Sequence, residues 1–425
     1  NTRLSINHIN NFNFCCMNVS LKVLKNKKIQ ESITISGSKS ESNRLLILKE
    51  LYPQLTIENL SDSDDSVHLQ QALSSTEILV NIGHAGTAMR FLTAYFAVKK
   101  SREVVLTGSE RMQNRPIEIL VNALNSLGAE IEYEEKKGYP PIRIKGKEIT
   151  TDTVAINGNV SSQYISALLL IAPSLPNGLE IKLIGKVTSV PYINMTLSLL
   201  RQLNVHATFE ENILKVLPLD IMEHKTIVVE SDWSSASYFY SVIAFSEIGS
   251  EIKLSAYRKE SLQGDSCLAE IYTHFGVVTE FHQNAVVLRK EKIHKSAKLI
   301  LDLKNAPDIA QTISVTCFGL RVACDLSGLH TLKIKETDRL EALQEELSNL
   351  GAQINVTSES LHLEISNTIH SNVAIKTYND HRMAMAFAPL AFKVPIQILD
   401  AEVVSKSYQK FWEDMEQIGI QVAHY

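Results

Sequence analysis

The feature that most constrains the fold of this sequence is a short segment that recurs six times along its 425 residues. Each copy is rich in Gly, Ser, Thr, Asp or Asn and leads directly into an apolar stretch with helical spacing. The copies begin near Gly37, Gly83, Gly158, Ser231, Asn305 and Asn379. Equivalent positions from the second copy onward lie 73 or 74 residues apart, whereas the first interval is 48 residues. A fixed period indicates one structural unit copied along the chain, and each helix start offers free N–H groups that attract anions.

A second element follows most of these helix starts: an amphipathic stretch that ends at Gly or Asn and continues into a short strand. In one copy the apolar residues on a single helical face are Leu340, Leu343, Leu347 and Leu350. The residues expected at the helix ends are Gly128, Asn204, Gly276, Gly351 and Gly419. Each unit is therefore predicted to run strand, helix, strand, helix, strand. Because a single core stops growing near ~250–300 residues, six units predict an α/β protein of two domains with three units each.

The composition excludes several classes of protein. A net charge of −5 argues against the broad basic surface of a nonspecific nucleic-acid binder, so we expect no nucleic-acid partner. No apolar run reaches the ~20 residues of a membrane span, which predicts no membrane partner. The five cysteines lack the spacing of a metal site, and we expect reduced thiols in a cytoplasmic protein with no metal and no cofactor.

The first sixteen residues differ in composition from the rest of the chain. They are rich in Asn, contain no acidic residue and lack the apolar core of a signal peptide. A strand-like stretch begins immediately after Met17. We expect residues 1–16 to be a disordered or non-native tail, and a chain truncated to begin at Met17 to keep its activity and solubility.

Charged side chains gather at the predicted helix starts. Residues 37–44 (GSKSESNR) are similar to the end of a nucleotide-binding P-loop but lack the Gly before Lys39, which argues against that function. Taken singly, each helix start is also explained by ordinary capping or by surface charge. Thr337, for example, is expected to cap the helix that begins near Arg339.

Helix starts that point to one end of the fold would bring cations and acids into one cleft. These residues are Lys39, Arg44, Arg115, Lys335, Arg339, Arg382 and Lys406, with the acids Asp308 and Glu336. Such a cleft suits substrates that carry phosphate and carboxylate groups, and two acids with a lysine can transfer protons. The residues alone therefore predict transfer or addition chemistry between small polyanionic metabolites.

Six motifs of this chain stand in the order and spacing typical of the 5-enolpyruvylshikimate-3-phosphate (EPSP) synthases: GSKSESNR, AGTAMR, RMQNRPI, SSQY, KETDRL and NDHRMAM. The chain resembles that family from about Val19 to its C-terminus. The resemblance implies a two-domain inside-out α/β barrel with three βαβαββ repeats per domain and an active site in the interdomain cleft. It also implies two chain crossings, so that residues 37–230 form one domain and residues 17–36 with 231–425 form the other. The implied protein is a cytoplasmic monomer without a cofactor.

The implied reaction joins shikimate 3-phosphate to phosphoenolpyruvate through a tetrahedral ketal and releases phosphate. By motif position, the residues implied to bind shikimate 3-phosphate are Lys39, Ser40, Arg44, Ser161, Ser162, Gln163, Ser189, Tyr192, Asp308, Thr331 and Lys335. Those implied to bind phosphoenolpyruvate are Lys39, Gly86, Arg115, Gln163, Arg339, Arg382 and Lys406. The catalytic residues are then Asp308, which takes the proton of the attacking hydroxyl, and Glu336 with Lys39, which serve proton transfer at the enol methylene.

Three positions depart from the common pattern of that family. His84 stands where the family commonly has Asn, before AGT. Phe91 stands where a Pro often follows the Arg of AGTAMR, and Thr331 stands where an Asn often contacts the substrate. Gly86 is expected to keep the phosphoenolpyruvate pocket open, so we expect glyphosate to inhibit competitively with phosphoenolpyruvate. His84 and Phe91 leave the strength of that inhibition open.

Two alternative functions compete with this interpretation. The sibling enolpyruvyl transferase that acts on UDP-N-acetylglucosamine typically carries a Cys near the equivalent of Arg115, and RMQNRPI contains none. A non-catalytic family member that only binds anions would be expected to lose charged positions, and all of them are present.

Overall fold

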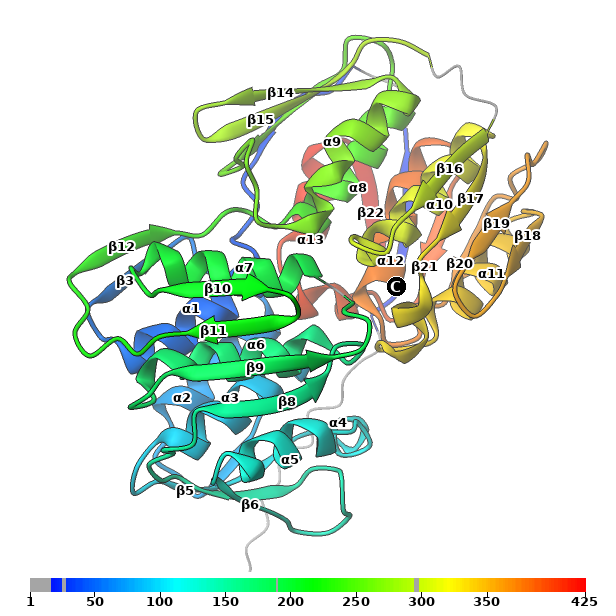
Figure 1. Cartoon of the computed structure of the whole chain (residues 1–425). Helices are drawn as coiled ribbons and strands as arrows, with labels where there is room; N and C mark the ends of the chain where they lie inside the picture. The colour runs from blue at the N-terminus through cyan, green and yellow to red at the C-terminus, as the bar shows by residue number, and fades with distance from the viewer. Residues whose placement is uncertain (1–16, 25–27, 189, 294–297) are drawn as a thin grey trace, which may run out of the picture.

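The computed structural model describes residues 17–24, 28–188, 190–293 and 298–425. The expected tail, residues 1–16, lies outside the described residues, as does Ser189. The chain forms a mixed α/β fold with two domains, as the sequence predicts (Figure 1). None of the helices in the described part of the chain is both long and apolar enough to cross a bilayer.

The second unit shows the repeated pattern most simply. Its elements are β4 (Leu79–Asn81), α3 (Gly86–Val98), β5 (Glu103–Thr107), α4 (Glu110–Gln113), α5 (Glu118–Ser126), β6 (Glu130–Tyr133) and β7 (Ile142–Lys145). Strands β4 and β5 are parallel, which requires a crossover such as α3, and β7 lies antiparallel between β5 and β6. The unit therefore ends in two strands rather than the single strand expected from the residues.

The third and fifth units repeat this order, with sheets β8-β9-β11-β10 and β16-β17-β19-β18. The third unit contains β8 (Thr153–Asn157), α6 (Ser162–Ile171), η1 (Ala172–Ser174), β9 (Leu179–Ile184), α7 (Val190–Gln202), β10 (Ala207–Glu210) and β11 (Ile213–Val216). The fifth contains β16 (Lys298–Asp302), η4 (Pro307–Ile309), α10 (Ala310–Leu320), β17 (Ala323–Ser327), η5 (His330–Ile334), α11 (Arg339–Asn349), β18 (Ile354–Val356) and β19 (Leu361–Leu363).

The fourth and sixth units each recruit a strand from the start of the chain. The fourth contains α8 (Trp233–Phe245), β13 (Glu251–Ser255), η2 (Gly264–Cys267), α9 (Leu268–Ile271), η3 (Tyr272–Phe275), β14 (Val277–His282) and β15 (Ala285–Lys290). The sixth contains β20 (Val373–Ile375), α12 (His381–Phe387), η6 (Ala388–Phe392), β21 (Ile396–Ile398), η7 (Ala401–Lys406), α13 (Phe411–Gln417) and β22 (Ile420–His424). Strand β1 (Val19–Val23) pairs antiparallel with both β21 and β22 and completes the sixth sheet.

Two strands are exchanged between the domains. Strand β2 (Gln30–Ile33) directly precedes α1 (Lys39–Leu51) but runs parallel to β13 of the fourth unit. Strand β12 (Lys225–Val228) precedes α8 but runs parallel to β3 (Leu55–Glu58), which follows α1. The chain therefore passes between the domains twice, once before α1 and once before α8.

The short first interval of the repeat has a structural explanation. The first unit consists of α1, β3 and α2 (Asp64–Ser74), and its sheet has two strands, β3 and β12. Over the residues that the structure describes, the other five units have four-stranded sheets. Without a second strand pair the first unit needs fewer residues, so its spacing to the next copy is 48 rather than 73 or 74.

The core of each domain lies around its helices. Nearly every residue of α3, α6, α8 and α10 is buried, whereas a strand such as β8 alternates between buried and exposed residues. One cluster of buried apolar side chains runs from Leu45 to Val229. The other combines residues from Val19 to Ile35 with residues from Trp233 to Val422. These clusters support the proposed domain boundaries, residues 37–230 and residues 17–36 with 231–425.

Several local predictions are confirmed. Asn204 and Gly351 adopt positive φ angles of 64° and 100° at helix ends, a conformation that Asn and Gly tolerate best. The predicted apolar face of α11 is fully buried at Leu340, Leu343, Leu347 and Leu350. The predicted cap Thr337 is wrong by one residue, because the Asp338 carboxylate accepts from the backbone N–H groups of Leu340 and Glu341 at 3.1 and 3.3 Å.

Candidate active site

A cavity of about 410 Å³ lies between the two domains. Its lining includes most of the residues that the sequence nominates: Lys39, Ser40, Arg44, Gly86, Arg115, Ser161, Ser162, Gln163, Tyr192, Asp308, Thr331, Lys335, Glu336, Arg339 and Arg382. These side chains come from the first domain and from the second, so the cavity depends on both. Ser189 lies outside the described residues, and Lys406 does not line the cavity.

Several of these residues are the first residues of their helices. Lys39 begins α1, Gly86 begins α3, Ser162 begins α6 and Arg339 begins α11. The prediction that helix starts meet in one place is therefore confirmed for these four helices. Because the N-terminal end of a helix dipole is positive, their meeting adds to the attraction for anions.

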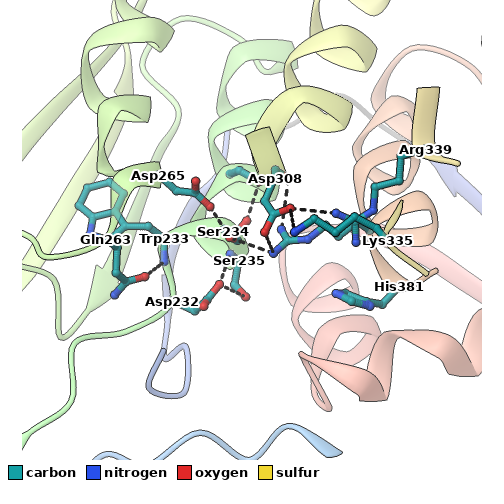
Figure 2. Close-up of polar contacts among 12 residues, drawn as sticks. Asp232, Trp233, Ser234, Ser235, Gln263, Asp265, Asp308, Lys335, Arg339 and His381 are labelled. Carbon is teal, nitrogen blue, oxygen red and sulfur yellow. Dashed lines mark hydrogen bonds and ion pairs between the residues drawn. The ribbon is translucent and has the colours of Figure 1, made fainter. Parts of the chain in front are cut away.

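Asp308 lies at the centre of the charged cluster (Figure 2). Its carboxylate is 3.2 Å from the Lys335 ammonium, 2.9 Å from the Arg339 guanidinium and 3.3 Å from the Arg382 guanidinium. Burial alone would raise the pKa of Asp308, but Arg382, Lys335 and Arg339 outweigh it and hold that pKa well below its usual range. Asp308 is therefore ionised.

Arg339 is buried and is surrounded by three carboxylates. Its Nε lies 2.6 Å from Asp380 and its Nη2 2.8 Å from Glu336, in addition to the Nη1 contact with Asp308. Burial would raise the pKa of Glu336, but the charge of Arg339, and then that of Lys39, outweighs burial and holds this pKa well below its usual range. Glu336 is therefore ionised as well, and the cleft holds a cluster of ion pairs in which positive and negative side chains alternate.

His381 lies beside this cluster of ion pairs, at the start of α12. Its side chain is buried, and both ring nitrogens lack a hydrogen-bond partner within the described part of the chain. Burial, followed by the charge of Lys39, keeps the pKa of His381 well below its usual range. The imidazole is therefore neutral, and His381 is among the residues that line the cavity.

Arg44 is not the solvent-facing residue that a simple helix start would present. It is buried, and its guanidinium donates to Thr196 Oγ1 at 2.7 Å, to the Ser40 carbonyl at 2.7 Å and to Ser166 Oγ at 3.0 Å. Burial lowers the pKa of Arg44 to about 10. Most of its donors thus hold α1 against α6 and α7 at the edge of the cavity.

The start of α3 is shaped by Gly86. A Cβ atom at this position would lie 2.5 Å from Nη1 of Arg115, closer than a side chain can approach. Glycine therefore allows the Arg115 guanidinium to lie directly over the helix start. Gln163 reaches the same place from α6, where its Nε2 donates to Thr87 Oγ1 at 3.3 Å.

Contacts across the cleft join the two domains. Nη2 of Arg111 donates to the backbone carbonyl of Glu336 and, at 3.4 Å, to that of Lys335. The Ser405 hydroxyl donates to the Asp64 carboxylate at 2.9 Å. The segment that carries Lys335 and Glu336 is thereby tied to the opposite domain.

Residues 66–415 match the family model described as EPSP synthase (3-phosphoshikimate 1-carboxyvinyltransferase). This match covers most of the chain. The chain belongs to the EPSP synthase family.

Relatives within the family agree over nearly their whole length. The chain is 44% identical to a 3-phosphoshikimate 1-carboxyvinyltransferase of Bacteroides fragilis, over 92% of this chain and 96% of that relative. It is 34% identical to a Haemophilus influenzae protein of the same name, with the same coverage.

Solved structures share the fold. An EPSP synthase from Acinetobacter baumannii superposes with a TM-score of 0.79 at 20% identity, covering 96% of this chain and 100% of that one. The enolpyruvyl transferase NikO from Streptomyces tendae gives a TM-score of 0.72 at 12% identity, covering 96% and 99%.

The three departures from the EPSP synthase pattern have different surroundings. Phe91 is buried beneath Arg44, whose Cζ lies 5.4 Å from the ring centroid, so Phe91 belongs to the core. Thr331 lines the cavity, and its hydroxyl has no hydrogen-bond partner among the described residues. His84 does not line the cavity, and its ring lies 5.9 Å from that of His68.

Lys406 also differs from its expected place. Its ammonium donates to the Asn379 carbonyl at 2.7 Å instead of facing the cavity. Burial lowers the pKa of Lys406, while the nearby charges of Glu336 and Asp380 act in the opposite direction. Its role toward phosphoenolpyruvate thus remains a prediction.

Other residues of the cavity were not found from the sequence as site residues. Asp232 and Ser234 lie at the start of α8, and Gln263 and Asp265 lie at the start of η2. The first pair falls within a repeated helix-start segment, which could have indicated it. The second pair falls outside the period, in a turn with no distinctive composition, so the repeat carries no signal for it.

Proposed function

We propose that this protein transfers the enolpyruvyl group of phosphoenolpyruvate to the 5-hydroxyl of shikimate 3-phosphate and releases phosphate. This transferase reaction belongs to the shikimate pathway, which leads to chorismate and the aromatic amino acids. The observation that carries the proposal is the interdomain cavity, where four helix starts and several Arg and Lys side chains surround two ionised carboxylates. A cavity of this kind attracts two polyanions at once and offers groups that move protons between them.

Phosphoenolpyruvate carries a phosphate and a carboxylate, and the cleft offers a separate place for each. Arg115 over the start of α3, together with Lys39, suits the phosphate. Arg339 and Arg382 suit the carboxylate, because planar guanidinium groups bind carboxylates in a bidentate manner. Shikimate 3-phosphate then takes the side formed by α6 and α7, with the serines at the start of α6 and with Tyr192.

Asp308 serves as the base that accepts the proton of the attacking hydroxyl. Three cationic side chains hold the pKa of Asp308 low, which makes it a weak base. When the phosphoenolpyruvate carboxylate engages Arg339 and Arg382, it shares their positive charge, and the pKa of Asp308 rises. The base therefore becomes effective only when phosphoenolpyruvate is present.

The reaction proceeds by addition and elimination. The 5-hydroxyl oxygen bonds to C2 of phosphoenolpyruvate, its proton passes to Asp308, and C3 gains a proton to become a methyl group. The C2–O bond to phosphate then breaks, and loss of a methyl proton restores the methylene. Because Glu336 is ionised, we assign Lys39 as the proton donor and Glu336 as the base that removes the methyl proton.

Phosphate release tests the proposal directly. Shikimate 3-phosphate and phosphoenolpyruvate would be supplied together, each alone, and with UDP-N-acetylglucosamine as the alternative acceptor. Release that requires both shikimate 3-phosphate and phosphoenolpyruvate is expected. Release with the nucleotide sugar instead would favour the sibling transferase, and ligand binding by calorimetry without any release would favour an anion-binding protein.

Three further properties are proposed on the strength of family membership and of Gly86 in the cavity wall. Glyphosate should compete with phosphoenolpyruvate, so its inhibition should weaken as phosphoenolpyruvate is raised. The protein should elute as a monomer in size-exclusion chromatography. A cytoplasmic location is the matching expectation, checked by cell fractionation.

A further inference from the structure

Asp265 is a carboxylate of the cleft that has no part in the mechanism above. It lies in η2, is 5% exposed and lines the interdomain cavity. Its Oδ2 accepts a hydrogen bond from the Ser234 hydroxyl, and Figure 2 shows both side chains on the far side of the cluster from Lys335. The carboxylate is thus directed toward the reacting groups through one serine.

Ser234 connects Asp265 to Arg382. The Ser234 oxygen accepts from Nη2 of Arg382 at 3.2 Å. The same Nη2 lies 3.3 Å from Oδ2 of Asp308, and Nη1 donates to the Asp308 carbonyl at 3.3 Å. A serine hydroxyl has a single proton, so donating it to Asp265 leaves the oxygen lone pairs for Arg382. The negative charge of Asp265 therefore fixes the donor and acceptor order of both hydrogen bonds, from Arg382 to Ser234 and from Ser234 to Asp265.

We propose that Asp265, acting through Ser234, is a positioning residue that holds the Arg382 guanidinium where it serves both Asp308 and the incoming substrate carboxylate. The proposal rests on the proposed function and extends it. When phosphoenolpyruvate engages Arg382, the pairing with Asp308 weakens. Asp265 then remains behind Arg382 as a fixed counter-charge, so the guanidinium does not have to reorganise during the reaction.

The surroundings of Asp265 argue against a purely structural role. Capping of α8 does not need it, because Asp232 already accepts from the Ser235 backbone N–H at 2.8 Å and from its hydroxyl at 3.1 Å. Burial, followed by the neighbouring charge of Asp308, raises the pKa of Asp265 to about 6. Keeping a carboxylate here costs free energy that a neutral side chain would avoid.

The first test measures phosphate-release kinetics of the two single variants, Asp265→Asn and Ser234→Ala, and of the double variant. Asn preserves shape and can still accept from Ser234, so this variant removes the charge alone. We expect each variant to raise KM for phosphoenolpyruvate about tenfold and to leave KM for shikimate 3-phosphate unchanged, because Ser234→Ala removes a hydrogen bond to a charged group and Asp265→Asn replaces it with a weaker neutral one. The double variant should be no worse than either single one, because both act through one connection.

Ser235→Ala is the matched control, since Ser235 neighbours Ser234 but its hydroxyl, among the described residues, hydrogen-bonds only to Asp232. Its KM values should equal those of the unmodified protein. Variants of Asp265 and Ser234 with unchanged KM but a lower melting temperature would overturn the proposal in favour of a structural role. Additive effects in the double variant would also overturn it. No phosphate release from the unmodified protein would overturn the proposed function and this inference together, which separates the two failures.

A pH series gives an independent readout. The groups that face Asp265 are Asp308 from η4, Arg382 from α12, Asp232 before α8 and Tyr192 from α7, with Cys267 in its own turn. As pH falls below about 6, Asp265 gains a proton, and Arg382 loses the negative charge that Asp265 places behind it through Ser234. KM for phosphoenolpyruvate should therefore rise more steeply in the unmodified protein than in Asp265→Asn. The substrate phosphate titrates near ~6 too, but equally for both proteins. Parallel pH curves would contradict the proposal.

Discussion

Replacing Glu41 by Gln should stabilise the protein at alkaline pH. Glu41 lies on α1, next to the place where the chain crosses between domains, and is 1% exposed. Its Oε1 accepts from Gln263 Nε2 at 3.1 Å. Burial, followed by the nearby charge of Glu230, raises the pKa of Glu41 to about 7 from an ordinary value of 4.5. The folded protein therefore holds a carboxylate that would be more stable in water.

The size and sign of the effect follow from this pKa. Raising the pKa of Glu41 from 4.5 to about 7 lowers the stability of the folded, ionised protein by roughly 3 kcal/mol, because each pH unit corresponds to about 1.4 kcal/mol. Because the folded state binds the proton more tightly than the unfolded chain, stability decreases as pH rises from about 4.5 to about 7 and then stays constant. Gln carries no charge, and its oxygen can still accept from Gln263. The variant should thus gain about 3 kcal/mol at pH 8 and almost nothing near pH 4.5.

Urea unfolding at pH 5 and pH 8, followed by tryptophan fluorescence, measures this difference. The chain has two tryptophans, and Trp233 lies beside the crossing, where its Nε1 donates to Glu230 at 2.8 Å. The exposed Glu50 of the same helix provides the control variant Glu50→Gln, which should show no pH-dependent gain. Equal stabilities of Glu41→Gln and the unmodified protein at pH 8, or the same difference at both pH values, would refute the reasoning.

Four other substitutions probe the cleft through steady-state phosphate release. Gly86→Ala should raise KM for phosphoenolpyruvate and weaken glyphosate inhibition, because the new Cβ displaces the Arg115 guanidinium; unchanged values would mean that Arg115 moves aside without loss. Asp308→Asn should lower kcat by about 100-fold or more through loss of the base, and Glu336→Gln should also lower kcat; near-normal turnover in either would contradict its assignment. Arg111→Ala removes a contact between domains and should raise KM for both substrates with little change in melting temperature; a KM change for one substrate alone would place Arg111 in that subsite.

The parts of the fold and site that follow a local rule could be predicted from the sequence. Helix starts recur with a fixed period, so Lys39 and Arg339 could be placed at the ends of helices before any coordinates were known. The buried face of α11 follows from the helical spacing of its leucines. These features depend on neighbouring residues alone, which is the information that one sequence carries.

The remaining parts depend on residues that are distant in sequence. The exchange of β2 and β12 was expected only from the family resemblance, because no local pattern decides which of two equivalent sheets a strand joins. The donors of Arg44 go to Thr196 and Ser166, more than 100 positions away. Asp265 escaped notice for a similar reason, since its importance arises from Ser234 and Arg382 on other elements.

The pairing of β1 with β22 has a consequence for folding during synthesis on the ribosome. The first domain can complete its sheets once β12 has emerged, near the middle of the chain. The sheet that contains β1 in the second domain can be completed only after β21 and β22 are synthesised, because β1 pairs with β21 along one edge and with β22 along the other. Strand β2 gains its partner β13 earlier, whereas β1 has no partner until β21 and β22 are made, and such an open edge invites aggregation. A nascent chain stalled before residue 420 should therefore carry one finished domain and one that cannot close, and slowing translation should not help the second domain fold earlier.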